Sequence, residues 1–252
     1  MTPLSLAEND LLQPRETKLL CLIKFGEEQH LKSLADGKLR CRHLEYYKAE
    51  ENRGKVFYDQ HEGLAGFYQA RQISIHFTPK NQPPVIINAD NGLVGQVPVS
   101  LNLKKPAFCM YAIHTGEWTN RKFTESEFED FKSYLQVTKK MEGGYKNKHV
   151  WVITDGLEFN SRLGKACKAQ NIGLQGDLVR YIDGDFHGTV PQKISGFVKT
   201  NEFSHEREYR YVFDAAHDLP DPFVLEVGSL KDISTIIPVE DFKNSWSIQF
   251  SE

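Results

Sequence analysis

Within the nine residues from His205 to Phe213, charged and aromatic side chains alternate from Glu208 to Tyr211, and this alternation strongly limits what the segment can form. With a period of two, one side carries the charged residues Glu206, Glu208 and Arg210. The other side carries the aromatic residues Tyr209, Tyr211 and Phe213. Aromatic side chains favour pleated strands, so the pattern predicts a half-buried β-strand whose charged side is open.

The open side of this predicted strand would carry two carboxylates at neighbouring positions. Like charges placed in this way repel, which costs stability unless a cation or a ligand compensates. Ordinary charge pairing on a solvent-exposed sheet face, worth ~0.2 to 1 kcal/mol per pair, is the plainer interpretation. The segment alone leaves both interpretations open.

The composition indicates a folded globular protein. Of the 252 residues, 40% are hydrophobic and 12% are aromatic, which excludes a disordered chain. The formal net charge of −3 gives no overall basic character, so a nucleic-acid partner would need a local basic patch. The cysteines have no CxxC spacing, which predicts reduced core thiols and no metal site. They are Cys21, Cys41, Cys109 and Cys167.

The domain organisation predicted from the sequence is simple. Residues 1–17 are expected to form a flexible N-terminal arm, and residues 18–252 to form one domain, because no linker or internal repeat divides them. No stretch resembles a signal peptide or reaches the length of a membrane span, so we expect a cytoplasmic protein.

Strand patterns outnumber helix patterns along the chain. Strands are predicted at residues 19–25, 39–41, 72–77, 85–88, 93–101, 107–113, 149–154, 177–182, 205–213, 223–227, 233–239 and 246–250. Helices are predicted at 27–36, 44–47, 125–139 and 155–170, and Thr124 with Glu127 predicts a capping box. The polar stretch 52–66 is predicted to be a loop beside a ligand cleft. The irregular mixture indicates an α+β fold with mixed, largely antiparallel sheets and flanking helices. Neither a Rossmann nor a P-loop motif is present.

Several short motifs, taken in order, carry a resemblance. They are residues 20–26 (LCLIKFG), 37–39 (GKL), 46–47 (YY), 108–111 (FCMY) and 203–210 (FSHEREYR). In this order they resemble a group of bacterial proteins whose layout is similar to that of ADP-ribosyltransferase-type toxins. The resemblance implies that Glu208 is the catalytic glutamate and that Glu206 acts on the acceptor. Lys24 takes the first-strand place, where such toxins usually have Arg or His, and their Ser-Thr-Ser element is absent, with residues 74–78 a loose substitute.

The resemblance also implies NAD as a substrate. Breaking the bond between nicotinamide and ribose passes through an oxocarbenium-like state, which one carboxylate can stabilise electrostatically. A second carboxylate two residues earlier can deprotonate or orient the acceptor. The predicted NAD contacts are Lys24, Tyr46, Tyr47, His76, Tyr111 and Arg210. Packing roles for the tyrosines, a surface position for His76 and screening of the glutamates by Arg210 are the alternatives.

We therefore expect an NAD-dependent ADP-ribosyltransferase toxin of bacterial anti-phage or toxin–antitoxin defence. Its acceptor would be a protein or a nucleic acid, and an antitoxin protein would be a further partner. One alternative is a non-catalytic module on the same scaffold that binds a nucleotide or a phage component. Another is a metal-dependent nuclease that uses Asp59, His61, Glu62 and the glutamate pair around Mg²⁺.

Overall fold

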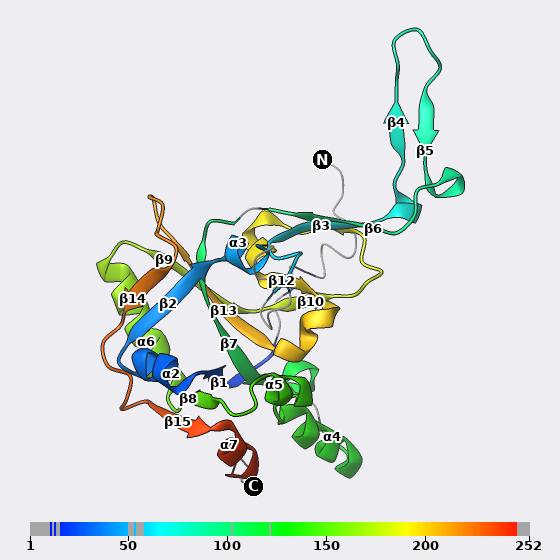
Figure 1. Ribbon diagram of the computed structural model, residues 1–252. Coiled ribbons are helices and arrows are strands. Elements are labelled where there is room, and N and C mark those ends of the chain that lie inside the picture. Colours follow the sequence, from blue (N-terminus) through cyan, green and yellow to red (C-terminus); the bar gives the residue numbers. More distant parts are fainter. Residues whose placement is uncertain are drawn as a thin grey trace. The chain divides into compact units, whose positions relative to one another are not determined.

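The computed structural model describes residues 16–49, 58–101, 103–120 and 122–245, and also Leu11, Gln13 and Arg53 (Figure 1). Contacts within the chain group it into two compact units. Unit 1 comprises residues 1–14, 44–103 and 180–202, and unit 2 comprises residues 15–43, 104–179 and 203–252. The chain passes back and forth between the units, so no single linker marks them in the sequence. The single domain over 18–252 stays a prediction, and the expected arm lies largely outside the described residues.

An eight-stranded antiparallel sheet forms the centre of unit 2. Its main path runs β14-β2-β7-β1-β8-β15, and β13 pairs with both β7 and β9. The strands are β1 (Leu19–Gly26), β2 (Lys38–His43), β7 (Pro106–His114), β8 (His149–Ile153), β9 (Gly173–Leu178), β13 (Glu208–Asp214), β14 (Phe223–Glu226) and β15 (Ser234–Pro238).

Strand β7 is central because it pairs with three others. β13 pairs with β7 from Ala107 to Tyr111, β2 pairs with it at Pro106 and Ala107, and β1 pairs with it from Tyr111 to His114. Ala107 pairs with both β13 and β2, and Tyr111 pairs with both β13 and β1. Because a strand residue has one partner on each edge, β2 and β1 both lie on the edge of β7 opposite to β13. β1 and β2 therefore lie along the same edge of β7, one at each end.

Alternate residues of these strands face two separate apolar clusters, one on each side of the sheet. Leu22 and Met110 belong to the cluster on what we call the first face, and Ile23 and Tyr111 to the cluster on the second face. Helices α2 (Glu28–Ala35) and α6 (Gly156–Ala169) bury side chains in the first cluster. Helices α4 (Glu125–Leu135) and α7 (Val239–Ser245) bury side chains in the second. Apolar side chains therefore cover both sides of the sheet.

The helix predicted over 125–139 is two helices. Its capping box is confirmed, because the Thr124 hydroxyl accepts from the Glu127 N–H while the Glu127 side chain accepts from the Thr124 N–H. Gln136 then leaves the helical conformation, and Thr138 caps α5 (Lys139–Gly144) by accepting from the Met141 N–H. The short helix η4 (Gly116–Trp118) precedes this region.

Unit 1 is built from small sheets and short helices. Strands β3 (Leu64–Gln69), β6 (Gln96–Ser100) and β11 (Gly188–Thr189) form a three-stranded sheet, while β10 (Arg180–Ile182) and β12 (Val198–Thr200) pair in parallel. β4 (Ile75–Phe77) and β5 (Val85–Ile87) form a separate two-stranded hairpin. The short helices are α3 (Leu44–Tyr47), η2 (Ala70–Gln72), η3 (Ala89–Asn91) and η5 (Gln192–Phe197). A further one, η6 (Asn201–Glu206), begins in unit 1 and ends in unit 2.

The α+β class with largely antiparallel sheets is confirmed. Strand β3 begins inside the stretch 52–66 that was predicted to be a loop. The prediction missed the start of the strand because Gly66 interrupts the strand pattern. A Cβ at Gly66 would come within 2.7 Å of the Tyr68 ring, so a larger residue there would have to displace that ring. The strand predicted at 246–250 lies outside the described residues. No helix in the described part of the chain is long and apolar enough to cross a membrane.

The Thr124 cap gives a direct test of this architecture. Thr124→Ala removes the acceptor for the Glu127 N–H, so we expect it to lower the free energy of unfolding by about 1 kcal/mol. Ser126→Ala, at an exposed position two residues into the same helix, is the matched control and should change stability by less than about 0.5 kcal/mol. Denaturant titration measures both changes, and equal stability of the two variants would contradict the capping role.

Candidate functional site

Glu208 and Arg210 form a buried ion pair on β13. The Arg210 Nε donates to the Glu208 Oε1 over 2.6 Å. Arg210 is 1% exposed and Glu208 is 5% exposed. Both lie on the second face of the sheet, where Glu208 is opposite Tyr111 and Arg210 is opposite Cys109 on β7. The prediction that this charged side is open is therefore wrong. Period-two alternation placed the two residues on one side correctly, but the packing of other segments decides whether a side is covered.

Glu206 does not belong to this strand. It is the last residue of η6, and β13 begins only at Glu208. Between them Arg207 has a φ of 39°, in the left-handed region that non-glycine residues seldom adopt. A left-handed residue breaks the two-residue alternation, so the predicted sharing of one strand face by Glu206 and Glu208 is also wrong.

Contacts from distant segments hold Arg207 in this conformation. Its Nη1 donates to the carbonyls of Tyr134 and Gln136, and its guanidinium lies 4.1 Å from the centre of the Tyr134 ring. Its own carbonyl accepts from the Ala112 N–H over 2.8 Å. The turn between the two glutamates is thus strained and firmly anchored within unit 2.

Aromatic rings lie beside this turn. The Phe25 ring meets the Tyr111 ring edge-on at 6.0 Å between centroids and stacks on the Tyr145 ring at 5.1 Å. The Tyr111 hydroxyl accepts from the Thr138 N–H, and burial raises the pKa of Tyr111. Burial raises the pKa of Tyr145, and the negative charge of Glu206 raises it further. Phe25 and Tyr145 were missed from the sequence because an apolar strand residue and a loop tyrosine carry no site signal.

Lys24 lies on the first face of the sheet, opposite to that of Glu208. The paired residues Leu22–Ala112 and Ile23–Tyr111 fix this orientation, and the Lys24 amine lies 5.1 Å from the centre of the Phe108 ring. Its Nζ donates to the Cys109 carbonyl over 2.5 Å, at the part of the β7 edge between the residues paired with β1 and with β2. Lys24 therefore has a structural role as the donor to the Cys109 carbonyl, while its role toward NAD stays a prediction.

The structure divides the predicted residues between the two units. Lys24, Tyr111, Glu206, Glu208 and Arg210 belong to unit 2, whereas Tyr46, Tyr47 and His76 belong to unit 1. The rings of Tyr46 and Tyr47 meet edge-on at 5.6 Å within α3. The exposed His76 imidazole on β4 shares a 2.8 Å hydrogen bond with the Ser74 hydroxyl.

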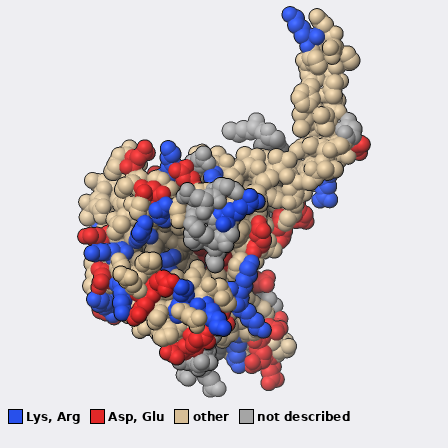
Figure 2. Space-filling model, viewed as in Figure 1, with Lys and Arg blue, Asp and Glu red and all other residues tan. Residues whose placement is uncertain are grey.

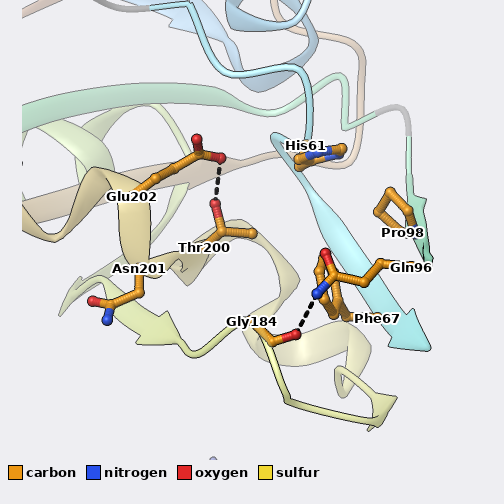
Figure 3. A pocket seen from close by; sticks show the side chains of 8 residues that line it. All are labelled: His61, Phe67, Gln96, Pro98, Gly184, Thr200, Asn201 and Glu202. Atoms are coloured by element: carbon orange, nitrogen blue, oxygen red, sulfur yellow. Dashed lines mark hydrogen bonds between the residues drawn. The ribbon is translucent and has the colours of Figure 1, made fainter. Parts of the chain in front are cut away.

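Unit 1 contains a cavity of about 520 Å³ (Figure 3). Its lining combines the Phe67 and Pro98 rings with polar side chains from three separate segments: His61, Gln96, Thr200, Asn201 and Glu202. The Thr200 hydroxyl donates to the Glu202 carboxylate over 2.8 Å. Burial lowers the pKa of His61, and the charge of Glu202 opposes this shift only in part. The cavity lining therefore combines two apolar rings with an imidazole, two amides, a hydroxyl and one carboxylate.

The carboxylates of the nuclease alternative in unit 1 accept hydrogen bonds from backbone N–H groups of their own loop. Asp59 accepts from the His61 N–H over 2.8 Å, and Glu62 accepts from the Gly63 N–H over 3.2 Å. Both carboxylates are buried in unit 1, while the glutamate pair belongs to unit 2. Across the described residues, no three His, Cys, Asp or Glu side chains are grouped so that they could hold a metal ion.

No family model, no curated protein and no solved structure matches the chain.

The strain at Arg207 can be measured with two substitutions. Arg207→Ala and Arg207→Gly both remove the guanidinium, but only glycine adopts the left-handed backbone without steric cost. We expect the glycine variant to be more stable than the alanine variant by about 1 kcal/mol in denaturant unfolding. At an ordinary loop position the order would be reversed, and that result would contradict a strained turn.

The cysteines give a second prediction. Burial raises the pKa of Cys21 and Cys167 to about 11 and that of Cys109 to about 12, and it also raises the pKa of Cys41. Because only the thiolate reacts, a group with a pKa near 11 is about 0.1% reactive at pH 8. All four thiols should react with Ellman's reagent at least about 100-fold more slowly in the native protein than after unfolding. A thiol that reacts at the unfolded rate would contradict this account.

Proposed function

We propose that this protein is an NAD-dependent ADP-ribosyltransferase whose catalytic glutamate is Glu208. The strained turn Glu206–Arg207–Glu208 carries the proposal, because left-handed non-glycine residues concentrate at functional sites. This turn contains the two glutamates on which the resemblance to ADP-ribosyltransferase-type toxins rests. Three features support a site at this place: a carboxylate held by Arg210, the Tyr111 ring opposite it, and a second carboxylate near Tyr145.

In this proposal Glu208 stabilises the positive charge that develops on the ribose. The electron pair of the breaking bond moves to the nicotinamide nitrogen, so nicotinamide leaves as a neutral molecule without needing a proton. Because Glu208 is shielded from water, its charge acts more strongly than an exposed carboxylate would. Arg210 fixes the orientation of the carboxylate, and Glu206 takes the proton from the acceptor as it bonds to the ribose carbon.

The remaining parts of the proposal follow the resemblance. Tyr111 and Arg210, on the same face of the sheet as Glu208, are the proposed contacts to NAD in unit 2. The roles of Lys24, Tyr46, Tyr47 and His76 toward NAD stay predictions, because Lys24 lies on the other face of the sheet and the other three belong to unit 1. The acceptor is a macromolecule, either protein or nucleic acid. The proposed setting is bacterial defence in the cytoplasm, with an antitoxin protein as partner.

The test uses purified protein, NAD labelled in the ADP-ribose part, and a bacterial lysate as the source of acceptor. Nicotinamide release and label transfer are measured together. Glu208→Gln keeps an oxygen for Arg210 but removes the charge, and we expect it to lower the rate about 100- to 1,000-fold. Tyr211→Phe is the matched control, because it removes a hydrogen bond to Asn160 from the other face of the same strand. It should lower stability by about 1 kcal/mol and leave the rate unchanged.

Two outcomes would reject the transferase proposal. One is wild-type protein that neither releases nicotinamide nor transfers label. The other is a Glu208→Gln variant as active as wild type.

Nucleotide binding without turnover is the second candidate function, and the unit 1 cavity favours it. Its aromatic ring, amides and carboxylate are groups that stack on and hydrogen-bond to a nucleoside (Figure 3). Calorimetric NAD binding that Glu208→Gln leaves intact and Glu202→Ala abolishes, in the absence of turnover, would support this function over catalysis.

A further inference from the structure

The hairpin formed by β4 and β5 has no other strand paired to it among the described residues. It extends from the part of unit 1 that contains β3 and β6 (Figure 1). All of its strand residues are exposed except Ile87, which is half-buried. Two-stranded hairpins are at best marginally stable in water, and stable ones pack an apolar face against something else. This hairpin therefore raises the question of what covers it.

One face of the hairpin is entirely apolar. The register pairs Ile75 with Ile87 and Phe77 with Val85, so these four side chains lie together on one side. Phe77 and Val85 are each 50% exposed. Among the described residues, seven of the ten exposed large hydrophobic side chains lie between residues 75 and 99. Such a concentration marks an interaction surface, because isolated apolar residues are otherwise scattered over a surface.

The charge of the segment narrows the choice of partner. Residues 73–99 contain only Lys80 and Asp90 as charged side chains, and the visible face of the hairpin is uncharged except at its tip (Figure 2). A nucleic acid or an anionic membrane would require a basic surface. The tip, residues 78–84 (TPKNQPP), is polar and rich in proline, so inserting it into a bilayer would bring Lys80 into the hydrocarbon. The partner that suits the apolar face of the hairpin is therefore an uncharged, apolar protein surface.

We propose that this surface is the same hairpin of a second copy of the chain. In an antiparallel, two-fold arrangement the apolar face packs on itself, and the two Lys80 side chains lie at opposite ends, where they do not repel. The face has no charge that such packing would bury. The inference does not rest on the transferase proposal, since its argument uses only the apolar face of the hairpin.

The test is the oligomeric state of the full chain, measured by sedimentation and by light scattering after size exclusion. We expect wild-type protein to be a dimer and Phe77→Lys to raise the dimer dissociation constant at least about 100-fold. Ile86→Lys is the matched control, because it adds the same charge in place of an exposed apolar residue on the opposite face of the same hairpin. It should leave the dimer intact.

Circular dichroism and the unfolding midpoint check that both variants fold. A monomeric wild type at 100 µM would overturn the proposal, in favour of a lipid surface if it binds neutral phosphatidylcholine vesicles and of a different protein if it does not. Dimers that Phe77→Lys leaves as tight as wild type would overturn it as well.

Discussion

Strand β7 has two edges and three partner strands, and much of unit 2 follows from that constraint. β13 occupies one edge, so β1 and β2 must divide the other, which leaves the Cys109 carbonyl between them. A carbonyl with no strand partner needs a donor, and the Lys24 amine supplies it. On its other edge Cys109 is opposite Arg210, so two cationic side chains approach this single residue from different strands. The first-strand lysine thus helps to join the sheet where β1 and β2 separate.

The buried pair of Glu208 and Arg210 is difficult to explain by stability alone. Removing one partner of a buried ion pair typically costs about 3 to 5 kcal/mol, but replacing both by apolar residues of similar size is often neutral or stabilising. Asp177 on β9 lies directly opposite Arg210, so the pair sits in a part of the second face that carries a further carboxylate. A carboxylate and a guanidinium at these positions therefore point to a requirement for an oriented charge. The proposed transferase site supplies such a requirement, since a developing positive charge needs a fixed anion nearby.

The sequence predicted well those features that depend on neighbouring residues. The sides of Glu208, Tyr209 and Arg210 follow from the pleat of an extended chain, and the Thr124 cap follows from two side chains three residues apart. The position of Glu206 did not follow in this way. Its displacement depends on Arg207, whose anchors are the carbonyls of residues more than sixty positions earlier in the chain. The burial of the charged face and the two interleaved units likewise depend on long-range packing, which no local pattern encodes.

Two features of the chain are unfavourable in free energy: the left-handed backbone at Arg207 and the exposed apolar face of the hairpin. The described contacts stabilise the first but do not cover the second. The left-handed Arg207 is strained, yet hydrogen bonds and a stacked ring from within unit 2 hold it in place. Its conformation is therefore preset before any ligand arrives, as a catalytic turn requires. The hairpin, in contrast, leaves an apolar face exposed, and in the described part of the chain no further strand pairs with it. A preset turn suits a small substrate that must be positioned, whereas an exposed apolar face is completed only by a surface of similar size and character. In the two proposals the features serve separate binding events, the turn for chemistry and the hairpin for assembly.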